Sequence, residues 1–219
     1  MKRFSYGLLL ALMFLAATGS ARASLIYDFA SPGATVLDGF DQGTFIVDGV
    51  PLTVSAGTMD QSGTFALGAA NAAMFVGAVT LFGDPPVTGL GVNSDIGSGA
   101  SVEGPLSRQE GLVFDFDPSF HPREIIVEHL GGFFGELRLF ADDAFLRDVA
   151  TVMGGNSISL PSGISRLAVT PRLFGIGLSS DPIYLVSQIT AIPEPATRTL
   201  FVLALAGLAF ATWRRLRQA

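Results

Sequence analysis

The sequence predicts an all-β domain between Ser24 and Ile192. Short apolar runs recur there about every 8–12 residues, a spacing typical of a β-sandwich. Gly-containing turn pairs separate the runs, and no stretch shows the apolar period of an amphipathic helix. About eleven strands in two sheets are expected. A jelly-roll arrangement is the preferred form because two Greek keys leave few exposed strand edges.

The first half of this domain carries one clear hairpin signal. Asp48-Gly49 is typical of a two-residue turn between antiparallel strands. Pro51 suits an edge strand or the start of a strand, because it has no N–H to donate. The run 72–82 is compatible with a strand or with a short helix. The strands expected in this half are 24–29, 44–47, 50–54 and 87–92.

A long polar connection, Asn93–Glu110, is expected in the middle of the domain. It far exceeds the usual loop of about 4–6 residues, and such loops are often functional or mobile. Leu112, Phe114 and Phe116 then alternate with Val113, Asp115 and Asp117, which predicts a half-buried strand. Later strands are expected over 123–130, around Leu137 and Leu139, over 144–152, around Ile158 and Leu160, and over 164–170 and 182–190.

The N-terminus has the three parts of a secretory signal peptide. Lys2 and Arg3 are positive, Leu8–Ala17 is apolar, and Ala21-Arg22-Ala23 has the small-residue pattern of a cleavage site. Residues 1–23 are therefore expected to direct export through the Sec translocon, with cleavage by signal peptidase. The ectodomain is expected over residues 24–191.

The C-terminus predicts a membrane-inserted helix. Thr199–Trp213 carries no charge, and its fifteen residues would span roughly 22 Å as a helix, against a bilayer core of about 30 Å. Snorkelling and local thinning reduce this mismatch. Arg214, Arg215 and Arg217 follow at once and would keep this end in the cytoplasm. The alternative is a buried core helix, since short apolar runs are often of that kind.

A Pro-Glu-Pro triplet, Pro193, Glu194 and Pro195, precedes the apolar run. The triplet, the run and the arginine cluster in this order resemble a PEP-CTERM sorting signal over residues 192–219. The resemblance implies that the tail is the substrate of an exosortase, a membrane-embedded cysteine protease or transpeptidase that cuts near the triplet. Arg198 departs from the family pattern, where an apolar residue is usual.

A second, looser resemblance lies within the domain. The segments Gly89–Asp95 and Glu110–Phe116 are similar to ectodomains that often accompany PEP-CTERM tails. This resemblance implies a lectin-like or carbohydrate-binding sandwich without a fixed activity.

The composition of the domain limits its partners. Between Ser24 and Ile192 there are six arginines, no lysine and 18 carboxylates, a net charge of −12. Such an acidic domain is a poor binder of nucleic acid. The chain has no cysteine, which excludes thiol nucleophiles and cysteine-bound zinc or iron–sulfur clusters. The domain retains only Tyr27 and Tyr184 and no Trp, so its composition does not support a sugar-stacking platform.

A solvated acidic face is the favoured interpretation of the acidic residues, and calcium is the cofactor that they suggest as the alternative. Hard cations take six to eight oxygen ligands, many of them carboxylates and loop carbonyls. The pair Asp142 and Asp143 is a second candidate, and no EF-hand spacing is present. The candidate ligands of the first group are Asp95, Glu103, Glu110, Asp115 and Asp117.

No catalytic residue is predicted. His121 and His129 are expected on the surface, and no nucleophile elbow, zinc-protease or nucleotide-binding motif occurs. We therefore expect a non-enzymatic protein that is anchored briefly in the inner membrane, facing the periplasm, and then moves to the outer surface or extracellular matrix. Its expected role is structural or adhesive, in a biofilm linked to exopolysaccharide. The alternatives are a carbohydrate-binding module and, least favoured, a secreted hydrolase.

Overall fold

A computed structural model describes residues 24–59, 63–79, 86–93, 109–131, 135–172 and 183–193. Ser24–Ile192 form one compact unit, and of the second unit (1–23 and 193–219) only Pro193 is described. The strands are β1 (Leu25–Asp28), β2 (Gln42–Val47), β3 (Val50–Met59), β4 (Phe65–Leu67), β5 (Ala73–Val79), β6 (Val87–Asn93), β7 (Gln109–Phe116), β8 (Phe120–Gly131), β9 (Gly135–Ala141), β10 (Ala144–Thr151), β11 (Gly154–Ser159), β12 (Arg166–Arg172) and β13 (Ile183–Pro193).

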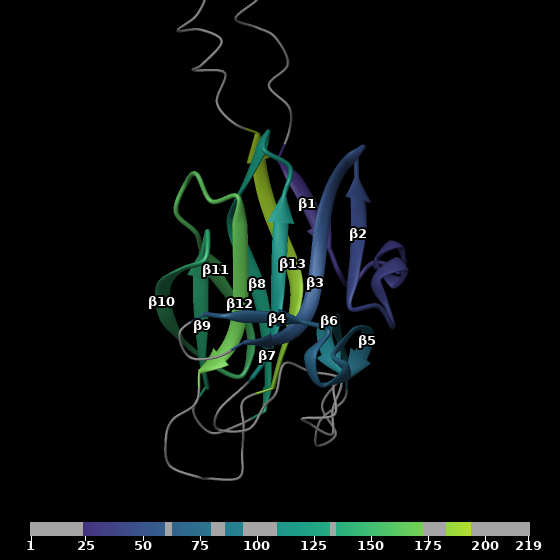
Figure 1. Cartoon of the computed structure of the whole chain (residues 1–219), viewed down its shortest axis with the longest axis vertical. Helices are drawn as coiled ribbons and strands as arrows, with labels where there is room; N and C mark the ends of the chain where they lie inside the picture. The colour runs from purple at the N-terminus through teal and green to yellow at the C-terminus, as the bar shows by residue number, and fades with distance from the viewer. Residues whose placement is uncertain are drawn as a thin grey trace, which may run out of the picture. The chain divides into compact units, whose positions relative to one another are not determined.

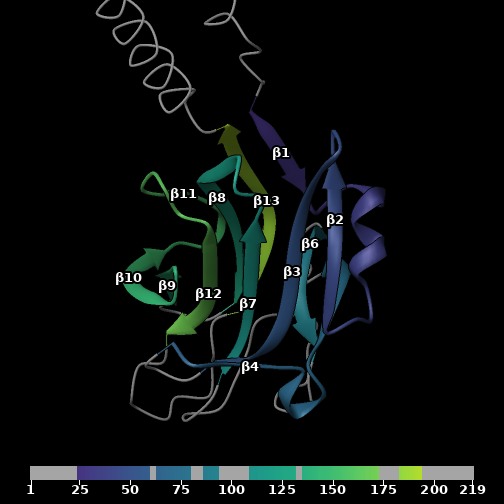
Figure 2. The same ribbon diagram turned by 45° about the horizontal axis from the view of Figure 1, so that its top comes forward.

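The strands form two sheets, and all the pairings with a described register are antiparallel (Figure 1). The six-stranded sheet has the order β11-β8-β13-β6-β5, with β1 also paired to β13. The seven-stranded sheet has the order β10-β9-β12-β7-β3-β2, with β4 also paired to β3. In Figure 2 the seven-stranded sheet lies in front of the other. The predicted all-β class is confirmed.

Strand β7 shows how the sequence builds the core. Leu112, Phe114 and Phe116 join the main cluster between the sheets, as their alternation predicts. Val113 packs on the opposite face with a smaller cluster that includes Phe140. Because both faces are covered, the middle of β7 is buried on both sides.

The hairpin of β2 and β3 confirms the turn predicted at Asp48-Gly49. Both turn residues have positive φ, 50° and 77°, as a two-residue hairpin of the I′ kind requires. Val47 and Val50 close the turn, and Ile46 faces Pro51 in the next pair. That next pair is of the non-hydrogen-bonded kind, so the missing N–H of Pro51 costs no bond to β2.

Several expectations about element boundaries need correction. The expected loop 93–110 ends earlier, because β7 begins at Gln109. The ambiguous run 72–82 contains strand β5. Two short 3-10 helices, η1 (Pro32–Leu37) and η2 (Ala69–Asn71), were not predicted, although Pro32 at the start of η1 is a usual helix-start residue.

No helical segment in the described ranges has the length and apolar character of a membrane span. The signal peptide at 1–23 and the helix expected at 199–213 both lie outside those ranges.

Candidate functional site

The first and last strands of the domain meet in one antiparallel pair, here called the terminal strand pair (Figures 1 and 2). Leu25 faces Ala191, and the register continues to Asp28 opposite Gln188. One residue further, the Phe29 N–H donates to the Ser187 carbonyl at 2.9 Å. The chain therefore enters and leaves the folded domain at the same place, although 165 residues lie between Leu25 and Ala191 in the sequence.

The terminal strand pair is part of the core. The side chains of Tyr27, Ile189 and Ala191 are fully buried, and Tyr27 packs its ring 6.2 Å from that of Phe45 and 6.4 Å from that of Phe116. Both of these phenylalanines belong to the seven-stranded sheet. Burial of large aromatic side chains is a main source of stability, so β1 is held by more than its backbone hydrogen bonds.

The last strand, β13, reaches the predicted sorting motif. Pro193, the first residue of the triplet, is the last residue of β13 and is partly exposed. The other residues predicted for sorting, leader cleavage and membrane anchoring lie outside the described residues: Ala21, Ala23, Glu194, Pro195, Arg214, Arg215 and Arg217.

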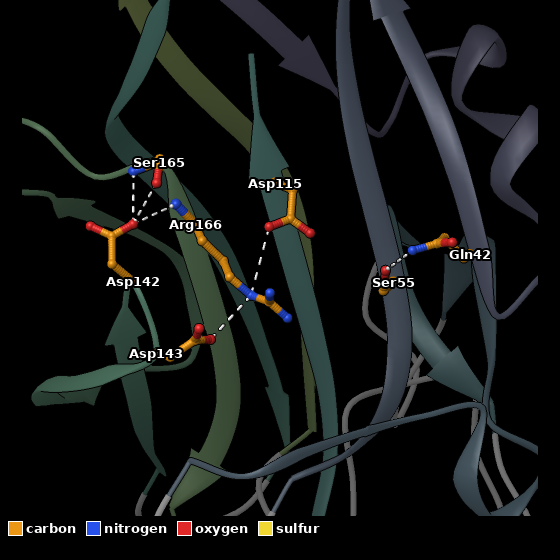
Figure 3. Close-up of polar contacts among 7 residues, drawn as sticks. All are labelled: Gln42, Ser55, Asp115, Asp142, Asp143, Ser165 and Arg166. Atoms are coloured by element: carbon orange, nitrogen blue, oxygen red, sulfur yellow. Dashed lines mark hydrogen bonds and ion pairs between the residues drawn. The ribbon is translucent and has the colours of Figure 1, made fainter. Parts of the chain in front are cut away.

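An acidic corner lies on the outer face of the seven-stranded sheet, formed by Asp115, Asp142 and Asp143 with Arg166 and Ser165 (Figure 3). Arg166 Nε lies 3.2 Å from Asp143 Oδ1 and 3.6 Å from Asp115 Oδ1. These are ion pairs by distance only, because Nε has no hydrogen bond of acceptable geometry in the described part of the chain. Arg166 thus neutralises part of the charge of the carboxylates that are predicted to bind a cation.

Asp142 caps the neighbouring loop within this corner. Its Oδ1 accepts hydrogen bonds from the Ser165 N–H at 3.0 Å, the Ser165 hydroxyl at 2.7 Å and the Arg166 N–H at 3.0 Å. Burial alone would raise the pKa of Asp142, but these bonds and the charge of His121 outweigh it and lower the pKa below its usual value. The carboxylate therefore stays ionised and holds the turn after β9.

The calcium candidates that the structure describes do not converge. Glu110 is fully buried in β7 rather than in a loop. It lies two residues before Leu112 and therefore on the same face of the strand, which faces the main core. Asp115 is on the opposite face, beside Arg166. Asp117 follows β7 and accepts hydrogen bonds from the Ser119 N–H and hydroxyl.

In the described ranges no three His, Cys, Asp or Glu side chains are placed so that they could hold one metal ion. Asp95 and Glu103 lie outside them.

A buried group, here called the polar bridge, joins the two sheets. Thr151, at the end of β10, has its hydroxyl 2.9 Å from Tyr184 Oη on β13 and 3.2 Å from His129 Nδ1 on β8. The rings of His129 and Tyr184 lie 5.0 Å apart. The prediction of a surface position is wrong for His129, which is 2% exposed. His121 is partly exposed, with its Nδ1 3.0 Å from the Ile164 carbonyl.

Both tyrosines of the domain are removed from solvent. Burial raises the pKa of Tyr184 to about 12, reduced in part by the Thr151 hydrogen bond and reinforced by the charge of Glu136. Burial, together with the charge of Asp117, raises the pKa of Tyr27 to about 12. Neither ring is available to stack on a sugar, which weighs against a carbohydrate-binding platform built from tyrosine.

Other polar contacts on the outer surface support the sheets. Gln42 Nε2 donates to Ser55 Oγ at 3.0 Å across β2 and β3 (Figure 3). Arg138 makes two bonds to Asp148, at 2.8 and 3.0 Å, across β9 and β10. These contacts join neighbouring strands, so their role is to support the sheet.

Neither the protein-family models nor the curated proteins compared with this chain give a match.

Proposed function

We propose that this protein is exported and held at the inner membrane by its C-terminal tail. An exosortase then processes it at the Pro193–Pro195 triplet. The ectodomain, as a jelly-roll or lectin-like sandwich, then has a structural or adhesive role in an exopolysaccharide-linked surface matrix. The proposal assigns no enzymatic activity to the domain.

The terminal strand pair is the structural observation that supports this proposal most directly. Leu25 follows the expected leader by one residue, and it lies opposite Ala191, two residues before Pro193. The start of β1 and the end of β13, which are the points where the expected leader and tail join the domain, are therefore neighbours in one strand pair.

The charge distribution supports the same orientation. The domain carries 18 carboxylates and six arginines, whereas the last residues of the chain carry three arginines after an apolar run. The tail would insert with its arginines toward the cytoplasm, and the acidic domain would be repelled by anionic lipid headgroups on the other side. After cleavage, nothing in the charge of the domain would keep it at the membrane.

Replacement of the triplet tests the proposal. The full-length precursor with Pro193→Ala, Glu194→Ala and Pro195→Ala should accumulate uncut in the membrane fraction of a host that has an exosortase. The wild-type chain should lose its tail there, as measured by immunoblot and mass spectrometry. Gln218→Ala, at the far end of the same tail, is the matched control and should be processed normally. Normal processing of the triple variant would refute the assignment.

A further inference from the structure

Strand β13 has neighbours on both of its edges. It lies between β8 and β6 in the six-stranded sheet, and β1 pairs with its C-terminal half. Val186 faces Leu90 of β6, and Gln188–Ala191 face β1. The Ser187 hydroxyl also donates to the Ile126 carbonyl of β8 at 3.3 Å. Little of the backbone before Pro193 presents an open edge.

Five side chains of β13 between Tyr184 and Ala191 are also inaccessible. Tyr184, Leu185, Val186, Ile189 and Ala191 are all between 0 and 1% exposed. Exposure of a peptide bond in this strand would require removal of these side chains from the core. Core strands open only at free energies close to that of global unfolding.

Proteases and other peptide-binding proteins commonly engage an extended segment through its main-chain hydrogen bonds. A strand already paired on both edges cannot offer those groups. We infer that the processing cut lies on the C-terminal side of Pro193, so that the processed protein keeps all of β13. This inference rests on the proposed function and assigns the cleavage position that the sequence leaves open.

The consequence for the processed domain is structural. A cut between Ile183 and Ala191 would remove part of a central strand and some or all of the residues that pair with β1. A cut after Pro193 leaves every described pairing in place. The folded domain therefore defines the upstream limit of the cleavage region.

The first test is the intact mass of the processed protein, purified from a host with an exosortase that expresses the full-length chain. The inference expects a C-terminal residue at Pro193 or beyond it. A C-terminus at Ile192 or earlier would overturn the inference while leaving exosortase processing intact. An untrimmed C-terminus would instead count against the proposed function.

A disulfide across the terminal strand pair gives the second test. The bond from Phe29 to Ser187 marks a hydrogen-bonded pair, so Ile26 and Thr190, three positions along the ladder, form a non-hydrogen-bonded pair. The Cα atoms of such pairs are about 4.5 Å apart, within the range that a disulfide spans. The chain has no cysteine, so Ile26→Cys with Thr190→Cys creates the only possible bridge.

The locked precursor should be cut at the same position and as completely as the wild-type chain. The single variants Ile26→Cys and Thr190→Cys cannot form the internal bridge and serve as controls. Thr44→Cys with Thr53→Cys places a comparable bridge in the β2–β3 hairpin, far along the chain from the tail. Loss of processing in the terminal-pair lock alone, with recovery under reductant, would show that β13 must open and would overturn the inference. Failure of the bridge to form would contradict the register on which it rests.

Discussion

The polar bridge and the acidic corner place similar chemistry in opposite surroundings. In the polar bridge, Thr151 hydrogen bonds join the two sheets in a region with almost no solvent exposure. In the acidic corner, the side chains of Arg166 and Asp143 are 36% and 76% exposed. A buried polar group that loses its partner keeps the full cost of its desolvation, whereas water replaces a lost partner at the surface.

This difference shows that the number of polar contacts is a poor measure of their importance. The acidic corner has more charged groups, yet screening reduces each exposed ion pair to at most about 1 kcal/mol. The polar bridge has no formal charge pair, but its three side chains come from β8, β10 and β13 and fix how the sheets meet. The two clusters should therefore respond very differently to conservative substitutions.

The largest effect is expected from Thr151→Val. This change removes the hydroxyl that contacts both His129 and Tyr184, and the free energy of unfolding should fall by about 1–3 kcal/mol. Thr151→Ser keeps the hydroxyl and is the matched control, with a smaller loss. Urea unfolding of the ectodomain measures both. Equal losses for the two variants would mean that the hydroxyl contributes nothing.

The second prediction concerns the pH dependence of stability that the two buried tyrosines, Tyr27 and Tyr184, produce. With Tyr27 and Tyr184 at a pKa of about 12 against an ordinary 10.0, the folded state holds their protons more tightly than the unfolded state. This difference contributes to the free energy of unfolding in full below pH 10, and the contribution is lost as the pH rises toward 12. Ultraviolet titration should show phenolate formation near pH 12 in the folded ectodomain and near pH 10 in urea. Titration of either tyrosine at the ordinary value in the folded state would contradict its burial.

The smallest effect is expected on the exposed side, from Arg166→Gln. Loss of the ion pairs with Asp115 and Asp143 should lower the free energy of unfolding by about 0.5 kcal/mol or less, and the loss should shrink in high salt. Arg123→Gln makes the same charge change at an exposed position of β8. This control distinguishes loss of the Arg166 ion pairs from the effect of a more negative net charge on stability. If Arg166→Gln lowered the free energy of unfolding as much as Thr151→Val, the acidic corner and the polar bridge would not differ in importance as argued.

Local patterns predicted the strands better than their partners. The alternation at Leu112, Phe114 and Phe116 identified β7, and Asp48-Gly49 identified the β2–β3 hairpin, because each signal lies within a few residues. Nothing local marks Leu25 as the partner of Ala191, since that pairing depends on the whole chain folding first. The terminal strand pair was accordingly not predicted.

The polar residues were the harder part to predict. The sequence predicts Glu110 at the end of a loop and His129 on the surface, because charged and titratable residues are seldom buried. Their burial is set by the position of each on its strand relative to the core face, and that register is fixed by tertiary contacts. Asp115 and Asp142 are predicted calcium candidates, whereas in the structure they lie beside Arg166 and Ser165, and no sequence signal identifies these two partners.

The pairing of β1 with β13 also sets an order of assembly. Because the chain is synthesised from its N-terminus, β1 is made first, whereas β13, with which β1 pairs, is made after all the other described strands. Until then Tyr27 and Phe29 have no completed core in which to pack, and they remain exposed to chaperones or to other chains. The pairing of β1 is thus completed only by β13, and a chain truncated before β13 would leave β1 with an unpaired edge that favours aggregation.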